Sequence, residues 1–177
     1  MKAIKKSIAY FLVGGSAVLA TSPQVMEFLG KWEGESQYVV YADKLAGGLP
    51  TVCKGITRYT SPYPLYVGDR WSPEKCKEVE EYVVYMTQEQ LQKCIKVPVT
   101  QGMFDALTSH AHNFGWNKTC NSQSVKAINV GEYEKGCNLL AYKPDGTPNW
   151  SNVGDVFYRG LHNRRKEERE LCLSSLN

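Results

Sequence analysis

The sequence predicts an α+β fold with a small sheet lobe and a larger, mostly helical lobe. Three observations carry this prediction. An apolar stripe at helical spacing covers residues 22–34, two β-prone runs around a glycine turn lie between residues 38 and 53, and helical spacing returns from residue 71 onward. The 177 residues are enough for one domain with a substantial core.

The first predicted helix begins at Ser22-Pro23, an N-cap residue followed by proline at the first helical position. Its apolar stripe consists of Val25, Phe28, Leu29 and Trp32. Gly34 provides the stop, so Glu33 is expected at the end of the helix beside the buried stripe.

A hairpin is predicted next. Residues 38–41 are β-prone, residues 46–50 contain a Gly-Gly turn, and residues 51–53 should return as the second strand. Residues 60–69, with two prolines and a glycine, indicate a loop.

The remainder is predicted to be helical. Ser72-Pro73 repeats the helix start, and residues 87–94 either continue that helix or form another. Thr100 caps a helix that closes near Gly115, and shorter helices are expected at about 122–130 and 132–141. Residues 143–155 indicate a loop, and residues 160–173 a final charged helix.

Charge disfavours a nucleic-acid partner. The chain has 21 basic and 18 acidic residues, but three lysines lie in the first 22 residues, which contain no acid. Without them the balance is 21 − 3 = 18 basic against 18 acidic residues, so the body is neutral.

Residues 1–22 are predicted to be an export segment, and residues 23–177 the folded domain. The three lysines precede a stretch, residues 7–26, in which all 20 residues are uncharged. As a helix it would span roughly 30 Å, a bilayer's hydrocarbon thickness. Glycine and polar residues weaken it, so it could enter a membrane and also leave it. The alternatives are a peptide cleaved after Ala20 and a buried N-terminal helix of a cytosolic protein.

The cysteines agree with export. All six follow residue 52, and an even number in an exported chain suggests up to three disulfides, with 15 possible pairings. No pair has C-x-x-C spacing, and none stands near a histidine in a ligand-like pattern. We expect neither a metal site nor a cofactor.

Glu33, Asp43 and Thr51 form the candidate catalytic set. Hydrolysis of a glycoside needs a protonated carboxyl for the leaving oxygen and a second group that activates or holds water. Glu33 beside an apolar face favours the protonated form, Asp43 in a turn favours the ionised form, and Thr51 offers a hydroxyl. Each residue alone is common at such positions for structural reasons, so the argument rests on the three together.

The sequence around these residues resembles that of the phage-type lysozymes, glycoside hydrolase family 24. The motifs in family order are Trp32-Glu33-Gly34, Tyr41-Ala42-Asp43, Pro50 to Thr57, Gln101 to Leu107, His112 to Gly115, Ala127 to Gly131 and Gly160 to Glu167. They extend over about residues 24–173. The resemblance implies a lysozyme-like fold and cleavage of the β-1,4 bond between N-acetylmuramic acid and N-acetylglucosamine in peptidoglycan.

The resemblance also implies residue roles. Glu33 would be the general acid, and Asp43 and Thr51 would hold the attacking water. The intervals between these residues are longer than the family's, and Ala46-Gly47-Gly48 is expected to absorb the excess. This shift makes Glu35 a rival for the acid.

Arg164 is expected to contact Glu33 or its surroundings, and Asn113 to support the site or bind substrate. The alternative for Arg164 is a solvated helix with Lys166–Glu170 and Arg165–Glu168 ion pairs. The family's histidine after the hairpin glycine is absent, because Ile56 stands there. The implied disulfides are Cys53–Cys76, Cys94–Cys120 and Cys137–Cys172.

The N-terminal stretch resembles the signal-anchor-release segments of some phage endolysins. This implies export to the host periplasm, tethering to the inner membrane and later release. We expect a monomer. The alternatives are a chitinase-like glycosidase and a non-catalytic, disulfide-bonded cell-wall-binding protein.

Overall fold

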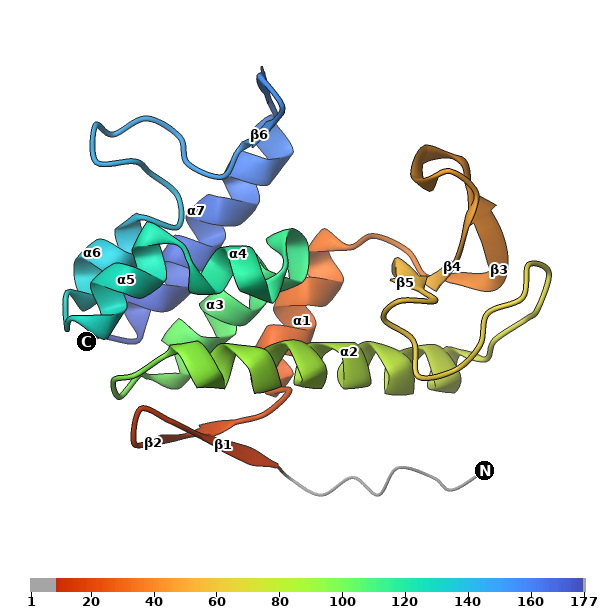
Figure 1. Ribbon diagram of the computed structural model, residues 1–177, viewed down its shortest axis with the longest axis horizontal. Helices are drawn as coiled ribbons and strands as arrows, with labels where there is room; N and C mark the ends of the chain where they lie inside the picture. The colour runs from red at the N-terminus through yellow and green to blue at the C-terminus, as the bar shows by residue number, and fades with distance from the viewer. Residues whose placement is uncertain (1–8, 177) are drawn as a thin grey trace. The chain divides into compact units, whose positions relative to one another are not determined.

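The computed structural model describes residues 9–176 and has two compact units (Figure 1). The sheet unit comprises residues 26–86. The helical unit comprises the described residues up to 25 together with those from 87 onward. Two helices, α1 and α2, pass from one unit into the other.

Apart from α4, the helices begin within one residue of where the sequence predicts them. Their bounds are α1 Pro23–Trp32, α2 Pro73–Cys94, α3 Gln101–Phe114, α4 Trp116–Cys120, α5 Gln123–Asn129, α6 Tyr133–Asn138 and α7 Arg159–Ser174. The Oγ atoms of Ser22 and Ser72 accept from the backbone N–H three residues on, each at 3.1 Å, and Thr100 caps α3 in the same way at 3.2 Å. Residues 87–94 continue α2, so the open alternative is decided in favour of one helix.

The sheet unit contains the predicted hairpin and one further strand. Strands β3 Gln37–Asp43, β4 Leu49–Cys53 and β5 Ile56–Thr57 form an antiparallel sheet in chain order. Its buried cluster consists of Val40, Val52, Cys53, Ile56, Leu65, Trp71, Cys76 and Val79. One face of the sheet therefore packs on this core, and the other face is not part of it.

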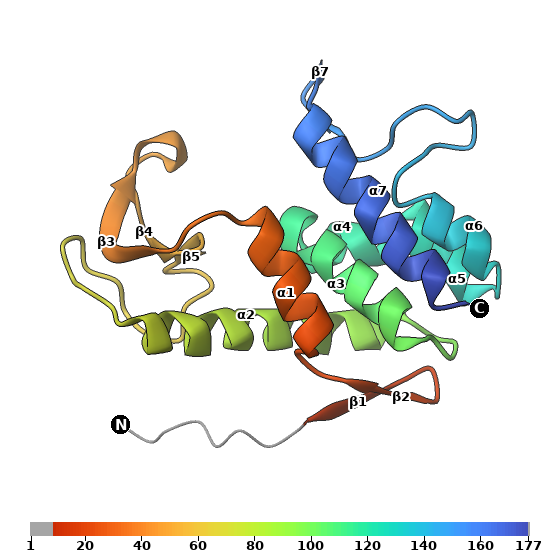
Figure 2. The same ribbon diagram turned by 180° about the vertical axis from the view of Figure 1, so that it is seen from behind.

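The helical unit is centred on α3, which is buried from Gly102 to Ala111. Helix α7 packs along α3 (Figure 2). Gly102 permits this approach, because an added Cβ would lie 2.7 Å from the Ser175 Cβ and 2.8 Å from the Leu171 carbonyl oxygen.

The predicted export segment has an unexpected conformation. Residues 1–8 lie outside the described part, but β1 Tyr10–Val13 and β2 Ser16–Leu19 form an antiparallel hairpin. Its buried side chains are Phe11, Val13 and Val18, and the Phe11 ring meets Phe104 of α3 edge-on at 6.1 Å. The alternative of a buried N-terminal helix is wrong for residues 10–19. Within residues 9–176, no helix has both the length and the apolar character needed to cross a bilayer.

Polar side chains of α2 and α3 form hydrogen bonds with residues 19–22, at the end of this hairpin and just after it. The Gln101 amide accepts from Leu19 N at 2.7 Å and donates to Leu19 O at 3.1 Å. The Gln88 side chain accepts from Thr21 N at 2.9 Å. The Ser22 hydroxyl donates to the Asp105 carboxylate at 2.7 Å.

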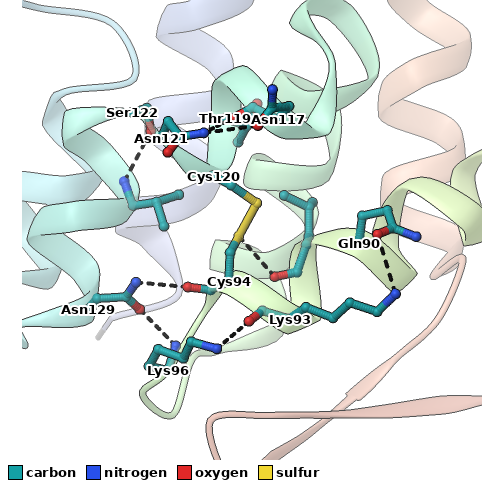
Figure 3. Close-up of a disulfide and its surroundings, with 12 residues drawn as sticks. Gln90, Lys93, Cys94, Lys96, Asn117, Thr119, Cys120, Asn121, Ser122 and Asn129 are labelled. Atoms are coloured by element: carbon teal, nitrogen blue, oxygen red, sulfur yellow. Dashed lines mark hydrogen bonds between the residues drawn. A yellow bond between two sulfur atoms is a disulfide. The ribbon is translucent and has the colours of Figure 1, made fainter.

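All six cysteines are paired as the family resemblance implies, in Cys53–Cys76, Cys94–Cys120 and Cys137–Cys172. Figure 3 shows the second of these, which joins the end of α2 to the end of α4. Beside it, Asn129 Nδ2 donates to Cys94 O at 2.8 Å, and its Oδ1 accepts from Lys96 N at 2.8 Å. The loop after α2 is thus held covalently and by hydrogen bonds.

Several short elements were not predicted. Besides β5 and the β1–β2 hairpin, they are helix α4 and a small hairpin of β6 Asn152–Val153 with β7 Val156–Phe157, which begins in the predicted loop of residues 143–155 and ends just beyond it. Each of these elements has five residues or fewer, too few for a hydrophobic period to show.

Candidate active site

Glu33 lies immediately after α1. Its backbone N–H donates to Leu29 O at 3.1 Å, so the residue is still held by the last helical turn. Gly34 then adopts a φ of 70°, which turns the chain away. Glu33 is half-buried, whereas the rival Glu35 is exposed and lies two residues farther from the helix end. This local geometry favours Glu33 as the positioned carboxyl.

Asp43 and Thr51 share one face of the sheet. In the register of β3 and β4, Tyr41 is directly opposite Thr51, and Asp43 is opposite Leu49. Directly opposed residues point to the same face, as do residues two apart along a strand. Asp43 and Thr51 are therefore diagonal neighbours, roughly 7 Å apart, which leaves room for one water between their side chains.

The Thr51 hydroxyl uses its proton in a hydrogen bond within the protein. Thr51 is only 3% exposed, and its Oγ1 donates to Leu49 O at 3.0 Å. With its proton committed, the oxygen offers lone pairs to an outside donor. Asp43 as a carboxylate also accepts, so a water between them can give one hydrogen to each and direct its own lone pair outward.

The loop after Asp43 has the extra length noted in the sequence. It forms a turn of 3-10 helix, Lys44–Ala46, followed by Gly47 and Gly48 with φ values of 67° and 83°. Gly48 N donates to Asp43 O at 2.7 Å, which closes the loop at the base of the two strands. The predicted role of the glycines in absorbing the longer interval fits this arrangement.

Arg164 lies in a buried polar cluster of the helical unit. Its guanidinium donates to the backbone and side-chain oxygens of Ser109, each at 3.2 Å, and its Nε lies 3.4 Å from Glu168 Oε1. Ser109 Oγ donates to the same carboxylate at 2.6 Å. The Arg164–Glu33 contact would join the two units and stays a prediction.

Arg165 and Asn113 belong to the same cluster. Arg165 pairs with Glu168, and both side chains are fully buried. Arg165 Nη1 also donates to Asn113 Oδ1 at 2.9 Å, and the expected role of Asn113 in supporting the site or binding substrate stays a prediction. Burial raises the pKa of Glu168, and the neighbouring Arg165 opposes that rise. The Arg165–Glu168 pair thus belongs to the core, and the alternative of a solvated pair is wrong for these two residues.

The ring of Trp150 packs inside the helical unit, with its centroid 4.7 Å from that of His110 and 5.0 Å from that of Phe114. Tyr41, which belongs to the Tyr41-Ala42-Asp43 motif, lies directly opposite Thr51, and sequence reasoning assigned it no role. Its alternation with Asp43 along one strand was a visible signal for a shared face.

A surface hollow of about 880 Å³ lies in the helical unit, with Glu132, Lys135 and Tyr142 among its lining residues, and it contains none of the candidate catalytic residues. Among residues 9–176, no three His, Cys, Asp or Glu side chains are arranged to hold a metal ion.

Comparison with known proteins gives a consistent answer. The family model described as phage lysozyme matches residues 30–168. The SAR-endolysin of Enterobacteria phage P21 is 29% identical over 174 residues, covering 96% of this chain and 95% of that protein. The SAR-endolysin of Pseudomonas phage phiKMV is 31% identical, covering 78% of this chain and 79% of that protein.

The fold agrees with a solved structure. The crystal structure of the active form of P1 phage endolysin Lyz superposes with a TM-score of 0.71 at 25% identity. It covers 89% of this chain and 87% of that one. The similarity therefore includes most of both units.

Proposed function

This chain belongs to the phage lysozyme family, and on that premise we propose that Glu33, Asp43 and Thr51 are the groups with which it cleaves peptidoglycan. The protein is a glycoside hydrolase, a muramidase endolysin. The observation that carries the residue assignment is the β3–β4 register, which brings Asp43 and Thr51 to one face.

The proposed reaction follows from the polarity of these groups. Glu33 donates its proton to the oxygen that leaves with the neighbouring sugar. A water held by Asp43 and Thr51 attacks the anomeric carbon, and Asp43 takes the water's proton. The C–O bond breaks as the new one forms, so the products are two shorter glycans and the total charge is unchanged. Inversion at the anomeric carbon requires the two carboxyls to stand about 6.5–9.5 Å apart.

The decisive experiment replaces Glu33 by glutamine. Loss of the proton donor is expected to lower the rate by about 10²–10⁴-fold, while the isosteric amide leaves the fold intact. The measurement is the loss of turbidity of outer-membrane-permeabilised bacteria, with circular dichroism and a thermal melt to check folding.

Glu35→Gln is the matched control, because it makes the same change two residues away on an exposed side chain. Retained clearing by Glu33→Gln, with clearing lost in Glu35→Gln, would move the acid to Glu35. A wild-type protein that binds walls without clearing the suspension would instead be the non-catalytic wall-binding alternative.

For localisation, we propose that the chain is exported and held at the inner membrane by its N-terminal segment before release. Two observations support this. Two of the SAR-endolysin relatives match over 96% of this chain, and Phe11, Val13, Val18, Ala20 and Val25 are buried in the folded protein, where they cannot lie in a bilayer at the same time. Helix α1, which positions Glu33, begins at Pro23, inside the uncharged stretch of residues 7–26, so membrane exit and completion of the site are coupled.

A further inference from the structure

We propose that Tyr41 is a sugar-binding residue of this enzyme, on whose ring the glycan strand rests beside the bond that is cleaved. The proposal depends on the function proposed above for Asp43 and Thr51. It adds a binding residue for N-acetylated sugar rings to a site so far described only by its acid and its water-holding pair.

The register carries the first step. Tyr41 of β3 is directly opposite Thr51 of β4, and Thr51 is directly opposite Thr57 of β5. These three side chains form one row across the sheet, on a single face. Asp43, two residues beyond Tyr41, lies on that face in the next row. Tyr41 thus adjoins both members of the water-holding pair.

The second argument is the difference in exposure between Tyr41 and the residue paired with it. Tyr41 is 39% exposed although Thr51, opposite it, is 3% exposed. Val39, the previous residue on this face, is also an exposed apolar side chain. Val40 between them is buried in the core cluster of the sheet unit. The strand therefore presents an apolar, partly aromatic surface to the outside, next to two hydrogen-bond acceptors.

Such a surface suits a sugar. A pyranose ring has an apolar C–H face and a polar rim, and tyrosine offers an apolar ring with a polar tip. The ring of Tyr41 packs against the C–H face, while the acceptors next to it meet the water and the polar rim. If Tyr41 served only to favour the strand conformation, it could lie on either face of the sheet. Its place on the face of Asp43 and Thr51 therefore points to a binding role.

Tyr38 provides a matched comparison on the same strand. It is also 39% exposed, but its side chain lies on the face of the sheet that carries Val40, which is not the face that carries Tyr41. The β3 register with β4 shifts between Gln37 and Tyr41, but on its other edge the strand pairs with residues 69–71 in the regular antiparallel pattern, because Tyr38 O accepts from Trp71 N and Val40 N donates to Asp69 O, both at 2.8 Å. The two tyrosines therefore differ in face and not in exposure.

The first test compares Tyr41→Ala, Tyr41→Phe and Tyr38→Ala in the full chain, acting on soluble peptidoglycan glycan strands. Tyr41→Ala is expected to raise KM about tenfold, the factor that corresponds to about 1.4 kcal/mol of lost contact. Tyr41→Phe keeps the ring and should stay within about threefold of wild type. Tyr38→Ala should leave KM unchanged. Equal KM values for Tyr41→Ala and Tyr38→Ala would overturn the proposal.

A second measurement avoids any change at Tyr41. In the Glu33→Gln variant, both tyrosines are nitrated with tetranitromethane and followed by mass spectrometry, with and without soluble glycan strands. At a glycan concentration about ten times Kd, Tyr41 should react about tenfold more slowly and Tyr38 at its original rate. Undiminished nitration of Tyr41 while the strands are bound refutes the proposal alone. Failure of wild type to cleave the strands refutes the proposed function, and the inference with it.

Discussion

At the scale of single residues, the helical unit is built around buried polar side chains. Glu168, Arg165, His110 and Thr108 are fully buried, and Arg164 is nearly so. A buried ion pair is costly to break, because removing one partner leaves the other charge without compensation. The cluster therefore ties α7 to α3 and places a strict demand on the identity of its side chains.

His110 makes stability depend on pH. Burial lowers its pKa well below the usual value, and the charges of Arg165 and Arg164 add to that effect. Its Nδ1 lies 2.8 Å from Thr119 Oγ1, and the rings of Phe114 and Trp150 lie against it. The unfolded chain thus binds a proton more readily than the folded one. The contribution is fully present above about pH 6.5 and is lost as pH falls below that value toward the folded pKa.

We expect the free energy of unfolding to fall between pH 7.5 and 5.5 by up to about 1.4 kcal/mol per pH unit from this residue. His110→Phe should flatten that slope, whatever its effect on absolute stability. Urea denaturation of both proteins across this range is the measurement. Parallel slopes would show that another group controls the dependence.

At the scale of elements, the N-terminal hairpin is held by a close approach at its turn. Gly14 and Gly15 both have positive φ values, 55° and 99°. A Cβ at Gly14 would lie 1.9 Å from Val97 O, whereas one at Gly15 would meet nothing within 4 Å. The two positions therefore carry similar backbone constraints and differ in packing against the helical unit.

Gly14→Ala is accordingly expected to destabilise the released protein by about 1–3 kcal/mol more than Gly15→Ala, which is the size of an overpacking penalty. Both changes add the same methyl to the export segment, so their effects on membrane insertion cancel. Thermal or urea unfolding of the two soluble proteins gives the comparison. Equal losses of stability would mean that the hairpin does not dock through this turn.

At the scale of the whole molecule, the proposed tethering gives one segment two exclusive locations. If residues 7–26 lie in lipid before release, α1 cannot pack from Pro23 onward as it does in the folded protein, and the helix end that holds Glu33 is not in place. The tethered enzyme should therefore digest purified peptidoglycan about a hundredfold more slowly per molecule than the released form, since the general acid is out of place. Washed membranes and the soluble fraction of one culture are compared.

Leu12→Lys is the control for this experiment. Leu12 is 72% exposed in the hairpin, so lysine should fit the folded protein, but a charge in the middle of a spanning segment costs about 2.5–3.5 kcal/mol. This variant should appear in the soluble form from the start and be active. Equal rates for tethered and released wild type would contradict the coupling.

The helices other than α4 and the β3–β4 hairpin could be predicted because their signals are local, and the same local signals single out the candidate catalytic residues. Ser22, Ser72 and Thr100 cap helices through bonds to the third residue along. The conformation of residues 10–19 could not be predicted in this way, because an uncharged apolar stretch suits lipid and a protein core equally well. Gln101 and Phe104, far along the chain, decide its place in the folded form.

By itself, the sequence determined which residues are available for the chemistry and in what order, since Glu33-Gly34, Asp43 and Thr51 stand at element ends and turns that short-range rules define. Only the tertiary structure decided which side chains share a face. The strand register joins Tyr41, Asp43 and Thr51, and burial turns an apparent surface pair, Arg165 and Glu168, into part of the core. The physical reason is that periodicity and capping act over a few residues, whereas register and burial depend on partners distant in the chain.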